Sequence, residues 1–463
     1  METSKIYNKH HYEAKNGFLK PLPVKVLQFG TGVLLRGLPD YFINKANKKG
    51  IFNGTIVVVK STTTGGVGEF EQQDNLYHHV IKGLVAGKEI NELHENTSIS
   101  RVLVASTQWQ DILALAKSPE LKIVISNTTE AGLVFDPNDT DAQSVPSSFP
   151  GKLLAVLWHR WNHFKIRAND FGLIILPTEL VPDNGTFLKK IIIDLATLQQ
   201  LPNEFITWII VSNDFCNTLV DRIVTGNLPE KEQLQLEAQL GYQDHLLITS
   251  EPFALWAIET SHKRTVNELC FAQVDPGVIV APSIEKFREL KLRLLNGTHT
   301  FSCGVAILAG FETVKEAMLD ADFRNYINEL IRFEIGPTLI NNEITNDEVN
   351  AFADVVLDRF SNPNIAHFWK SIAMNYTEKM KMRNTPIIEK YISSDKKVPE
   401  LICFSFAVYC IYQESLFQIK VDMNEFSLNQ TFQAEVKYWI QLIQQSDVKK
   451  IMHQLVKNKV AKS

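Results

Sequence analysis

Lys291, Asn296 and His299 stand in one short stretch and together form a set suited to proton transfer at a hydroxyl-bearing carbon. A lysine can act as a base near neutral pH where burial or a neighbouring charge lowers its pKa. An asparagine amide can donate a hydrogen bond to a developing alkoxide, and a histidine can orient the reacting hydroxyl group. The residue types therefore predict acid/base chemistry with stabilisation of an oxyanion.

The spacing of these three residues has two interpretations. In an α-helix, His299 lies about 80° and Asn296 about 140° around the axis from Lys291, so all three can face one cleft. Gly297 weakens the case for a regular helix at this point. The spacing alone favours the alternative of a solvated lysine, a helix-capping asparagine and a surface histidine, because polar residues are common on a solvated face.

Length and composition narrow the class of protein. The chain has 463 residues, with 45% hydrophobic and 21% charged residues, which predicts a globular protein of two or three domains. A net charge of −5 gives no electrostatic case for nucleic acid. The first residues lack the apolar core of a signal peptide, and no apolar run approaches the roughly 20 residues that cross a bilayer. We therefore expect a cytoplasmic enzyme or binding protein with a small-molecule partner and no membrane.

The cysteines give no sign of a metal centre. Five of them are scattered along the chain without a CxxC pair or a Cys/His ligand spacing. We expect buried free thiols and no bound metal.

A phosphate-binding turn is predicted near the amino terminus. Residues 24–29 form an apolar strand that runs into Gly30, Thr31, Gly32 and Val33, and a helix follows. Glycines let the backbone approach a pyrophosphate, whose charge the helix N-terminus favours. The motif is only partial, since Arg36 and Gly37 stand where the usual pattern has its third glycine, and a plain tight turn is the alternative.

Further strands indicate a parallel sheet. Residues 56–59 form an apolar run typical of a central strand, and Lys60 follows where an acidic ribose-binding residue is usual, which leaves NADP(H) open beside NAD(H). Residues 123–125 form another strand and end in a polar cluster that contains Asn127 and Glu130. Ligands of open α/β sheets bind at such strand ends, although a polar turn with a helix cap is the alternative.

The remainder of the first half adds two strands and a second polar group. We expect strands at 172–177 and 278–281, with another apolar run at 205–211. Three polar residues follow that run at helical spacing and could support a site or form a local surface pair: Asn217, Asp221 and Arg222.

The pattern becomes helical beyond Pro282. Thr345 to Glu348 fits a capping box that opens a helix, and the basic tail from 449 is expected to be a frayed helix end. The fold class is therefore α/β, with a Rossmann-type doubly wound sheet domain at 1–281 and a mostly α-helical domain at 282–463. Further helical patterns cover residues 311–333, 367–382, 401–417 and 432–445.

Over nearly its whole length the sequence resembles the long-chain polyol dehydrogenase family typified by mannitol dehydrogenase, and within it the branch that acts on tagaturonate. The K-x4-N-x2-H spacing of the catalytic stretch is specific when the other blocks accompany it in this order. The resemblance rests on residues 28–32 with Arg36, 73–77, 126–132, 217–226, 291–300 and 359–363.

The resemblance implies metal-independent hydride transfer between NAD(H) and a sugar carbonyl. Lys291 would be the general acid/base, Asn296 would stabilise the oxyanion and His299 would hold the substrate. The glycine turn would carry the pyrophosphate. The other implied contacts are Asn127 and Glu130 near the nicotinamide, and Asp221 and Lys379 on the substrate, with Asn217 and Arg222 as support.

Two departures from the mannitol branch argue for a different substrate. A second oxyanion-hole asparagine of that branch aligns with Leu180, and an arginine aligns with Ser371. We therefore expect interconversion of D-tagaturonate and D-altronate, with a fructuronate reductase or a mannitol-type dehydrogenase as alternatives and a catalytically silent nucleotide-binding protein as a remote one. The expected oligomeric state is a monomer or a weak homo-oligomer. An acidic sugar needs a positively charged partner side chain to bind its carboxylate. The sequence does not rank the candidates for that partner: Arg36, Arg222, Lys379, Lys381 and Arg383.

Overall fold

The computed structural model describes residues 5–62, 65–128, 132–139, 145–393 and 398–460. The chain divides into two compact units. The first unit comprises Met1–Lys82 and Asn91–Ile284, and the second comprises Gly83–Ile90 and Glu285–Ser463. The change of unit at 284/285 lies three residues beyond the boundary expected from the sequence.

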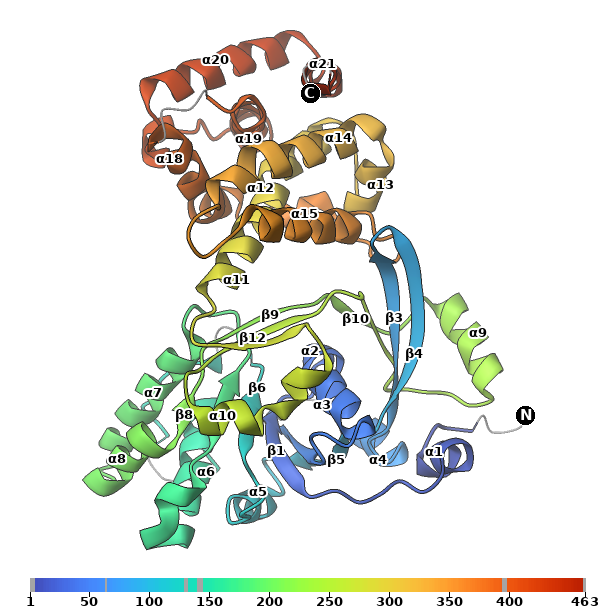
Figure 1. The fold of residues 1–463 in the computed structure, drawn as a ribbon, viewed down its shortest axis with the longest axis vertical. Helices are drawn as coiled ribbons and strands as arrows, with labels where there is room; N and C mark the ends of the chain where they lie inside the picture. Colours follow the sequence, from blue (N-terminus) through green and yellow to red (C-terminus); the bar gives the residue numbers. More distant parts are fainter. Residues whose placement is uncertain (1–4, 63–64, 129–131, 140–144, 394–397, 461–463) are drawn as a thin grey trace. The chain divides into compact units, whose positions relative to one another are not determined.

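A six-stranded parallel sheet forms the centre of the first unit (Figure 1). Its order is β5-β2-β1-β6-β7-β8, which is 3-2-1-4-5-6 when these strands are counted along the chain. This confirms the predicted doubly wound fold. The strands are β1 (Val24–Phe29), β2 (Thr55–Lys60), β5 (Ile99–Val104), β6 (Ile123–Ser126), β7 (Ile174–Pro177) and β8 (Asp214–Phe215).

Two smaller sheets accompany the parallel sheet. One has the order β10-β11-β3-β4 and the other the order β13-β12-β9. Their strands are β3 (Tyr77–Val85), β4 (Lys88–Asn96), β9 (Thr218–Asp221), β10 (Val224–Gly226), β11 (Ile248–Ser250), β12 (Leu255–Glu259) and β13 (Val278–Ala281).

Helices of the first unit cover the apolar faces of the parallel sheet. The central strands are apolar on both sides, so alternate residues enter two separate cores. One core includes Leu27 and Val57 with residues of α5 to α8, and the other includes Val26 and Ile56 with residues of α3. The helices are α1 (Lys9–Asn16), α2 (Val33–Gly37), α3 (Pro39–Lys48), α4 (Gly68–Gln72), α5 (Trp109–Leu115), α6 (Phe149–Phe164), η2 (Lys165–Phe171), α7 (Asn184–Leu198), α8 (Asn203–Ser212), α9 (Glu230–Leu240), α10 (Lys263–Glu268) and η3 (Cys270–Val274).

The second unit is built from helices around one apolar core (Figure 1). The predicted capping box is confirmed at the start of α15, where Thr345 and Glu348 satisfy each other's backbone N–H groups. The helices are α11 (Glu285–Glu289), η4 (Leu290–Gly297), α12 (Thr298–Leu308), α13 (Val314–Leu319), α14 (Ala321–Glu329), η5 (Leu330–Ile335), η6 (Gly336–Thr338), α15 (Asn346–Phe360), α16 (Trp369–Ile372), α17 (Tyr376–Lys379), η7 (Met380–Asn384), α18 (Thr385–Ser393), α19 (Glu400–Phe417), η8 (Met423–Phe426), α20 (Gln430–Gln445) and α21 (Val448–Val460).

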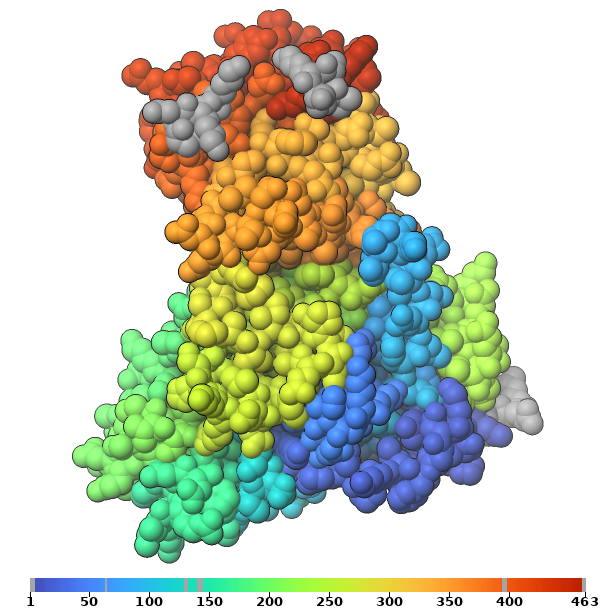
Figure 2. Space-filling model, in the orientation of Figure 1, coloured from blue at the N-terminus to red at the C-terminus, as the bar shows by residue number. Residues whose placement is uncertain are grey.

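The long β3–β4 hairpin was not foreseen, and its tip clusters with the second unit (Figure 2). The Gly87 N–H donates to the Asp358 carboxylate of α15 over 3.1 Å. Among the described helices, none has the length and apolarity needed to cross a membrane.

Two local predictions are wrong. The segment with Asp221 is a strand rather than a helix, because β9 pairs with β12 and buries every second residue, Thr218 and Val220. The described part of the basic tail, as far as Val460, is not frayed. Its helix α21 buries an apolar side that includes Met452 and Val456, while Lys459 pairs with Glu334 of η5.

Candidate active site

The strand order of the first unit marks one edge of its parallel sheet as the place where a ligand is expected. The order reverses between β1 and β6, and ligands of such sheets bind beyond the carboxyl ends of the strands at this point. The turn after β1 and the turn after β6 meet there. A Cβ on Gly30 would lie 3.0 Å from the carbonyl oxygen of Asn127.

Gly30 and Gly32 have different structural reasons to be glycine. Gly30 has a φ of +128°, which side-chain-bearing residues rarely adopt, and a Cβ there would crowd the Asn127 carbonyl oxygen and Leu35, each 3.0 Å away. Gly32 caps α2 in an ordinary extended conformation, and nothing lies within 4 Å of the place a Cβ would occupy. The open space above Gly32, beside Thr31 and Val33, fits close approach of a phosphate to the backbone.

Arg36 is placed away from this open turn. Its side chain is buried, its Nη1 donates to the Leu246 carbonyl, and its guanidinium stacks against the rings of Phe70 and Tyr77. The Tyr77 hydroxyl donates in turn to the Arg36 carbonyl over 2.8 Å. These contacts support a structural role for Arg36 more than the predicted cofactor contact.

A polar network joins the ends of β6 and β7. The Asn127 amide donates to the carbonyl and hydroxyl oxygens of Thr178. Glu179, which the sequence did not single out, accepts from the Thr128 N–H over 2.8 Å and from the Ser126 hydroxyl over 3.2 Å. Burial raises the pKa of Glu179 despite these donors. The predicted contact Glu130 lies outside the described residues.

Lys60 lies at the end of β2 and is buried. Its Nζ donates to the carbonyl of Thr62 over 2.5 Å and lies 3.3 Å from the Thr62 hydroxyl. The amine is therefore engaged by the adjacent loop rather than extended toward solvent.

The three polar residues around β9 have separate environments. The Asn217 amide donates to Glu259, and its oxygen accepts from the Thr186 N–H. Arg222 is buried and donates to the carbonyls of Gly37 and Glu251. Burial lowers the pKa of Arg222 to about 10, so it remains charged at neutral pH. Asp221 is the partly exposed end of β9.

In the second unit, Lys291 and Asn296 lie in a π-helix rather than an α-helix. Helix η4 follows α11 directly and continues into α12, which carries His299. A π-helix bonds residue i to residue i+5, so residues five apart lie about one turn from each other. Lys291 and Asn296, both partly buried, are thereby brought toward the same side, instead of the 140° separation expected for an α-helix.

His299 is held in an aromatic and basic environment. Its ring stacks on Phe360 with centroids 4.1 Å apart, and meets His367 edge-on at 5.1 Å. Burial lowers the pKa of His299 well below its ordinary value, which keeps the ring neutral with one donor and one acceptor nitrogen. Its buried Nε2 has no hydrogen-bond partner among the described residues. Four basic groups lower the pKa further: His367, Arg359, Arg383 and Lys379.

A second π-helix, η7, packs beside η4. Arg293 of η4 donates through Nη1 to the carbonyls of Met382 and Arg383, over 2.7 and 2.9 Å. Its Nη2 donates to the Glu289 carboxylate over 3.0 Å. The Asn384 amide donates to the Gly297 carbonyl. Gly297 also allows this packing, since a Cβ there would lie 3.3 Å from Ile387. Lys379, one residue before η7, donates to the Ile372 carbonyl over 3.0 Å.

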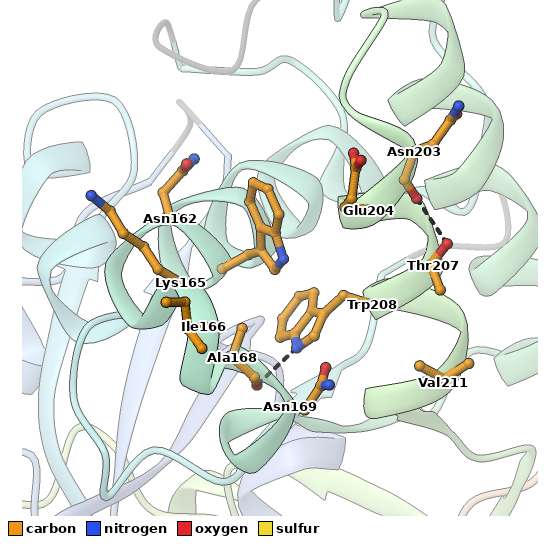
Figure 3. Close-up of a pocket in the computed structure, with 11 residues that line it drawn as sticks. Asn162, Lys165, Ile166, Ala168, Asn169, Asn203, Glu204, Thr207, Trp208 and Val211 are labelled. Carbon is orange, nitrogen blue, oxygen red and sulfur yellow. Dashed lines mark hydrogen bonds between the residues drawn. The ribbon is translucent and has the colours of Figure 1, made fainter.

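The first unit also has a surface hollow of about 830 Å³, which is separate from the turns after β1 and β6 (Figure 3). It lies between the end of α6, η2 and α8, and the Trp208 indole at its floor donates to the Ala168 carbonyl. Helix η2 leads into the amino end of β7, so this hollow adjoins the sheet edge opposite the strand ends that bind ligands.

Comparison with known proteins agrees with both units. Residues 24–269 match the mannitol dehydrogenase Rossmann domain, and residues 283–459 match the mannitol dehydrogenase C-terminal domain. The altronate oxidoreductase of Halalkalibacterium halodurans is 40% identical over 393 residues, which cover 84% of this chain and 75% of the relative. The altronate oxidoreductase of Bacillus subtilis is 37% identical over 385 residues, covering 83% and 78%.

Two solved structures share the fold. D-sorbitol dehydrogenase in substrate-free form has a TM-score of 0.77 at 20% identity, covering 96% of each chain. Pseudomonas fluorescens mannitol 2-dehydrogenase, in a ternary complex with NAD and D-mannitol, has a TM-score of 0.67 at 21% identity, covering 94% of this chain and 95% of that one. With both family domains matched in order, the chain belongs to the mannitol dehydrogenase family and is a dehydrogenase that acts on a CH–OH group.

Proposed function

We propose that this dehydrogenase interconverts D-tagaturonate and D-altronate with NAD(H), using Lys291 as its acid/base. The observation that carries the proposal is the extent of the match to relatives named altronate oxidoreductase, which covers most of the chain. The basic surroundings of His299 support it, because they suit an anionic sugar better than a neutral polyol.

The first unit binds the dinucleotide in this proposal. The residues of the glycine turn, Gly30 to Val33, hold the pyrophosphate, and Asn127 contacts the nicotinamide end; the expected contact of Glu130 falls outside the described residues. The open backbone at Gly32 fits that role. NAD(H), when bound, supplies or accepts the hydride. The contact of Lys60 with Thr62 supports NAD(H) over NADP(H), since this lysine is already engaged.

The second unit moves the proton. In the reducing direction, the Lys291 ammonium donates a proton to the nascent alkoxide, and in oxidation its neutral amine takes the proton of the hydroxyl group. The Asn296 amide donates a hydrogen bond to the oxyanion. His299, neutral because of its burial, donates to or accepts from a substrate hydroxyl and so orients the reacting carbon. Asp221 and Lys379 are proposed as further substrate contacts, with Asn217 and Arg222 as support for them.

A spectrophotometric screen tests the function. NADH and NADPH are each offered with D-tagaturonate, D-fructuronate and D-fructose, and the absorbance of the reduced nicotinamide is followed. We expect the highest kcat/KM with NADH and D-tagaturonate. Preference for D-fructuronate or D-fructose would replace the proposal by the corresponding reductase, and turnover of none of the three would favour a silent nucleotide-binding protein.

A lysine variant tests the mechanism. Lys291→Ala should lower kcat about 10²- to 10⁴-fold, the usual contribution of general acid/base catalysis, with NADH affinity unchanged. Lys370→Ala, at an exposed position of α16, is the matched control and should keep full activity. Full turnover by Lys291→Ala would refute the assigned role.

A further inference from the structure

The five basic side chains that could meet a substrate carboxylate differ in how their donors are already used. Arg36 and Arg222 are buried and donate to backbone carbonyls of the first unit. Lys381 is exposed and pairs with Glu425 over 2.5 Å. The other two, Lys379 and Arg383, both act electrostatically on His299. The Lys379 amine already donates to the Ile372 carbonyl, which leaves Arg383 as the candidate with donors to spare.

Arg383 has hydrogen-bonding capacity left over. Its Nη1 lies 3.3 Å from the Thr300 hydroxyl, one residue from His299 in the chain. Its Nε is buried and has no hydrogen-bond partner among the described residues. Leaving a buried N–H without an acceptor costs free energy. A ligand that supplies an acceptor to this N–H would recover that free energy on binding.

The position of Arg383 is fixed independently of its side chain. Its backbone carbonyl accepts from Arg293, which also binds the carbonyl of Met382. The next residue, Asn384, is tied to the Gly297 carbonyl at the end of η4. The backbone of Arg383 is therefore carried on a π-helix that is fastened to the helix of Lys291 and Asn296, and the Thr300 hydroxyl orients the guanidinium.

The surroundings of Arg383 call for an anion. The largest charged influences on His299 are all basic, and burial together with Arg383 lowers the pKa of Lys379. An uncharged ketose offers no negative charge to Arg383 and Lys379, whereas a carboxylate offers two oxygens to the planar fork of an arginine.

We propose that Arg383 binds the carboxylate of the substrate and makes the enzyme select a ketouronate over a neutral ketose. Lys379 assists by adding a second positive charge beside His299. This assignment rests on the proposed reduction of a ketouronate, and it singles out Arg383 from the five basic candidates as the residue that determines specificity.

The test compares one acidic and one neutral ketose in matched variants. D-tagaturonate and its neutral counterpart D-tagatose are reduced with NADH by the wild type, Arg383→Gln, Arg383→Lys and Lys381→Gln. Loss of a charge-assisted pair predicts a fall of about 10- to 100-fold in kcat/KM for D-tagaturonate in Arg383→Gln, mainly through KM. Turnover of D-tagatose should be unchanged or improved. If that turnover is too slow to follow, the inhibition constant of D-tagatose gives the same comparison.

The controls separate selectivity from folding. Lys381→Gln lies two residues away on the same π-helix and should behave as the wild type, and Arg383→Lys should recover part of the lost activity. NADH affinity should be the same in all four proteins. Equal losses with both sugars, or no loss with D-tagaturonate, would overturn the role of Arg383 alone. A wild type that reduces no ketouronate would overturn both this inference and the proposed function.

Discussion

Two alanine substitutions in the glycine turn separate its structural role from its binding role. Gly30→Ala places a side chain at a φ of +128°, 3.0 Å from both the Asn127 carbonyl oxygen and Leu35. Backbone strain of this kind costs about 1–3 kcal/mol, before the neighbouring backbone is displaced. Gly32→Ala has an ordinary φ of −63° and open space around the new methyl group, so its fold should be unaffected.

The two variants should therefore fail in different assays. Gly30→Ala should lose about 2–3 kcal/mol of stability and melt roughly 3–5 °C lower, measured by circular dichroism without nucleotide. Gly32→Ala should melt as the wild type does, yet bind NADH more weakly in a fluorescence titration, because its methyl group occupies the space in which a pyrophosphate approaches the backbone. Wild-type NADH affinity in Gly32→Ala would refute the assignment of this turn to the pyrophosphate.

Two further predictions concern the second unit. Thr345→Ala removes the hydroxyl that caps α15 and should lower the free energy of unfolding by about 1 kcal/mol, measured in urea. NADH affinity should be unchanged. A change smaller than the error of the measurement would contradict the importance of this cap. His299 has a folded-state pKa lowered well below its ordinary value, so the unfolded chain binds its proton first and stability falls as the pH drops below about 6.5. His299→Gln should remove up to about 1.4 kcal/mol per pH unit from that slope between pH 6.5 and 5.5, and an unchanged slope would show that the ring is charged in the folded protein.

Much of the fold follows from local signals. The strand β1 has the predicted limits, Val24 and Phe29, because a polar and proline-rich segment precedes it and a glycine turn ends it. The capping box of α15 is also local, since all its hydrogen bonds join residues three apart. The apolar run at 205–211 carried no such signal. Periodicity does not distinguish a short buried strand from a buried helix, and this run is the helix α8.

The environments of the charged residues depend on distant parts of the chain. Arg36 was a candidate ligand for cofactor or substrate, but the carbonyl that its Nη1 meets belongs to Leu246, 210 residues further along. Arg222 likewise donates to the carbonyl of Gly37, 185 residues earlier in the chain, and no local pattern predicts that either arginine is buried. Glu179 was missed in the same way, although its place directly after a predicted strand end is a signal that a polar-residue search at the sheet edge would find.

The stretch from Lys291 to His299 was singled out because the other family blocks accompany its spacing, and the structure gives that spacing a physical meaning. Asn296 lies five positions after Lys291, which suits the i to i+5 repeat of a π-helix and not the repeat of an α-helix. A π-helix is rare because it is less favourable than its α-helical neighbours, so something outside η4 must hold it. Arg293, fixed by Glu289, joins η4 to the carbonyls of a second π-helix, and Asn384 returns a hydrogen bond to Gly297. The alignment of the proposed acid/base with its oxyanion partner therefore depends on contacts between two segments about ninety residues apart, which explains why spacing alone favoured a solvated lysine.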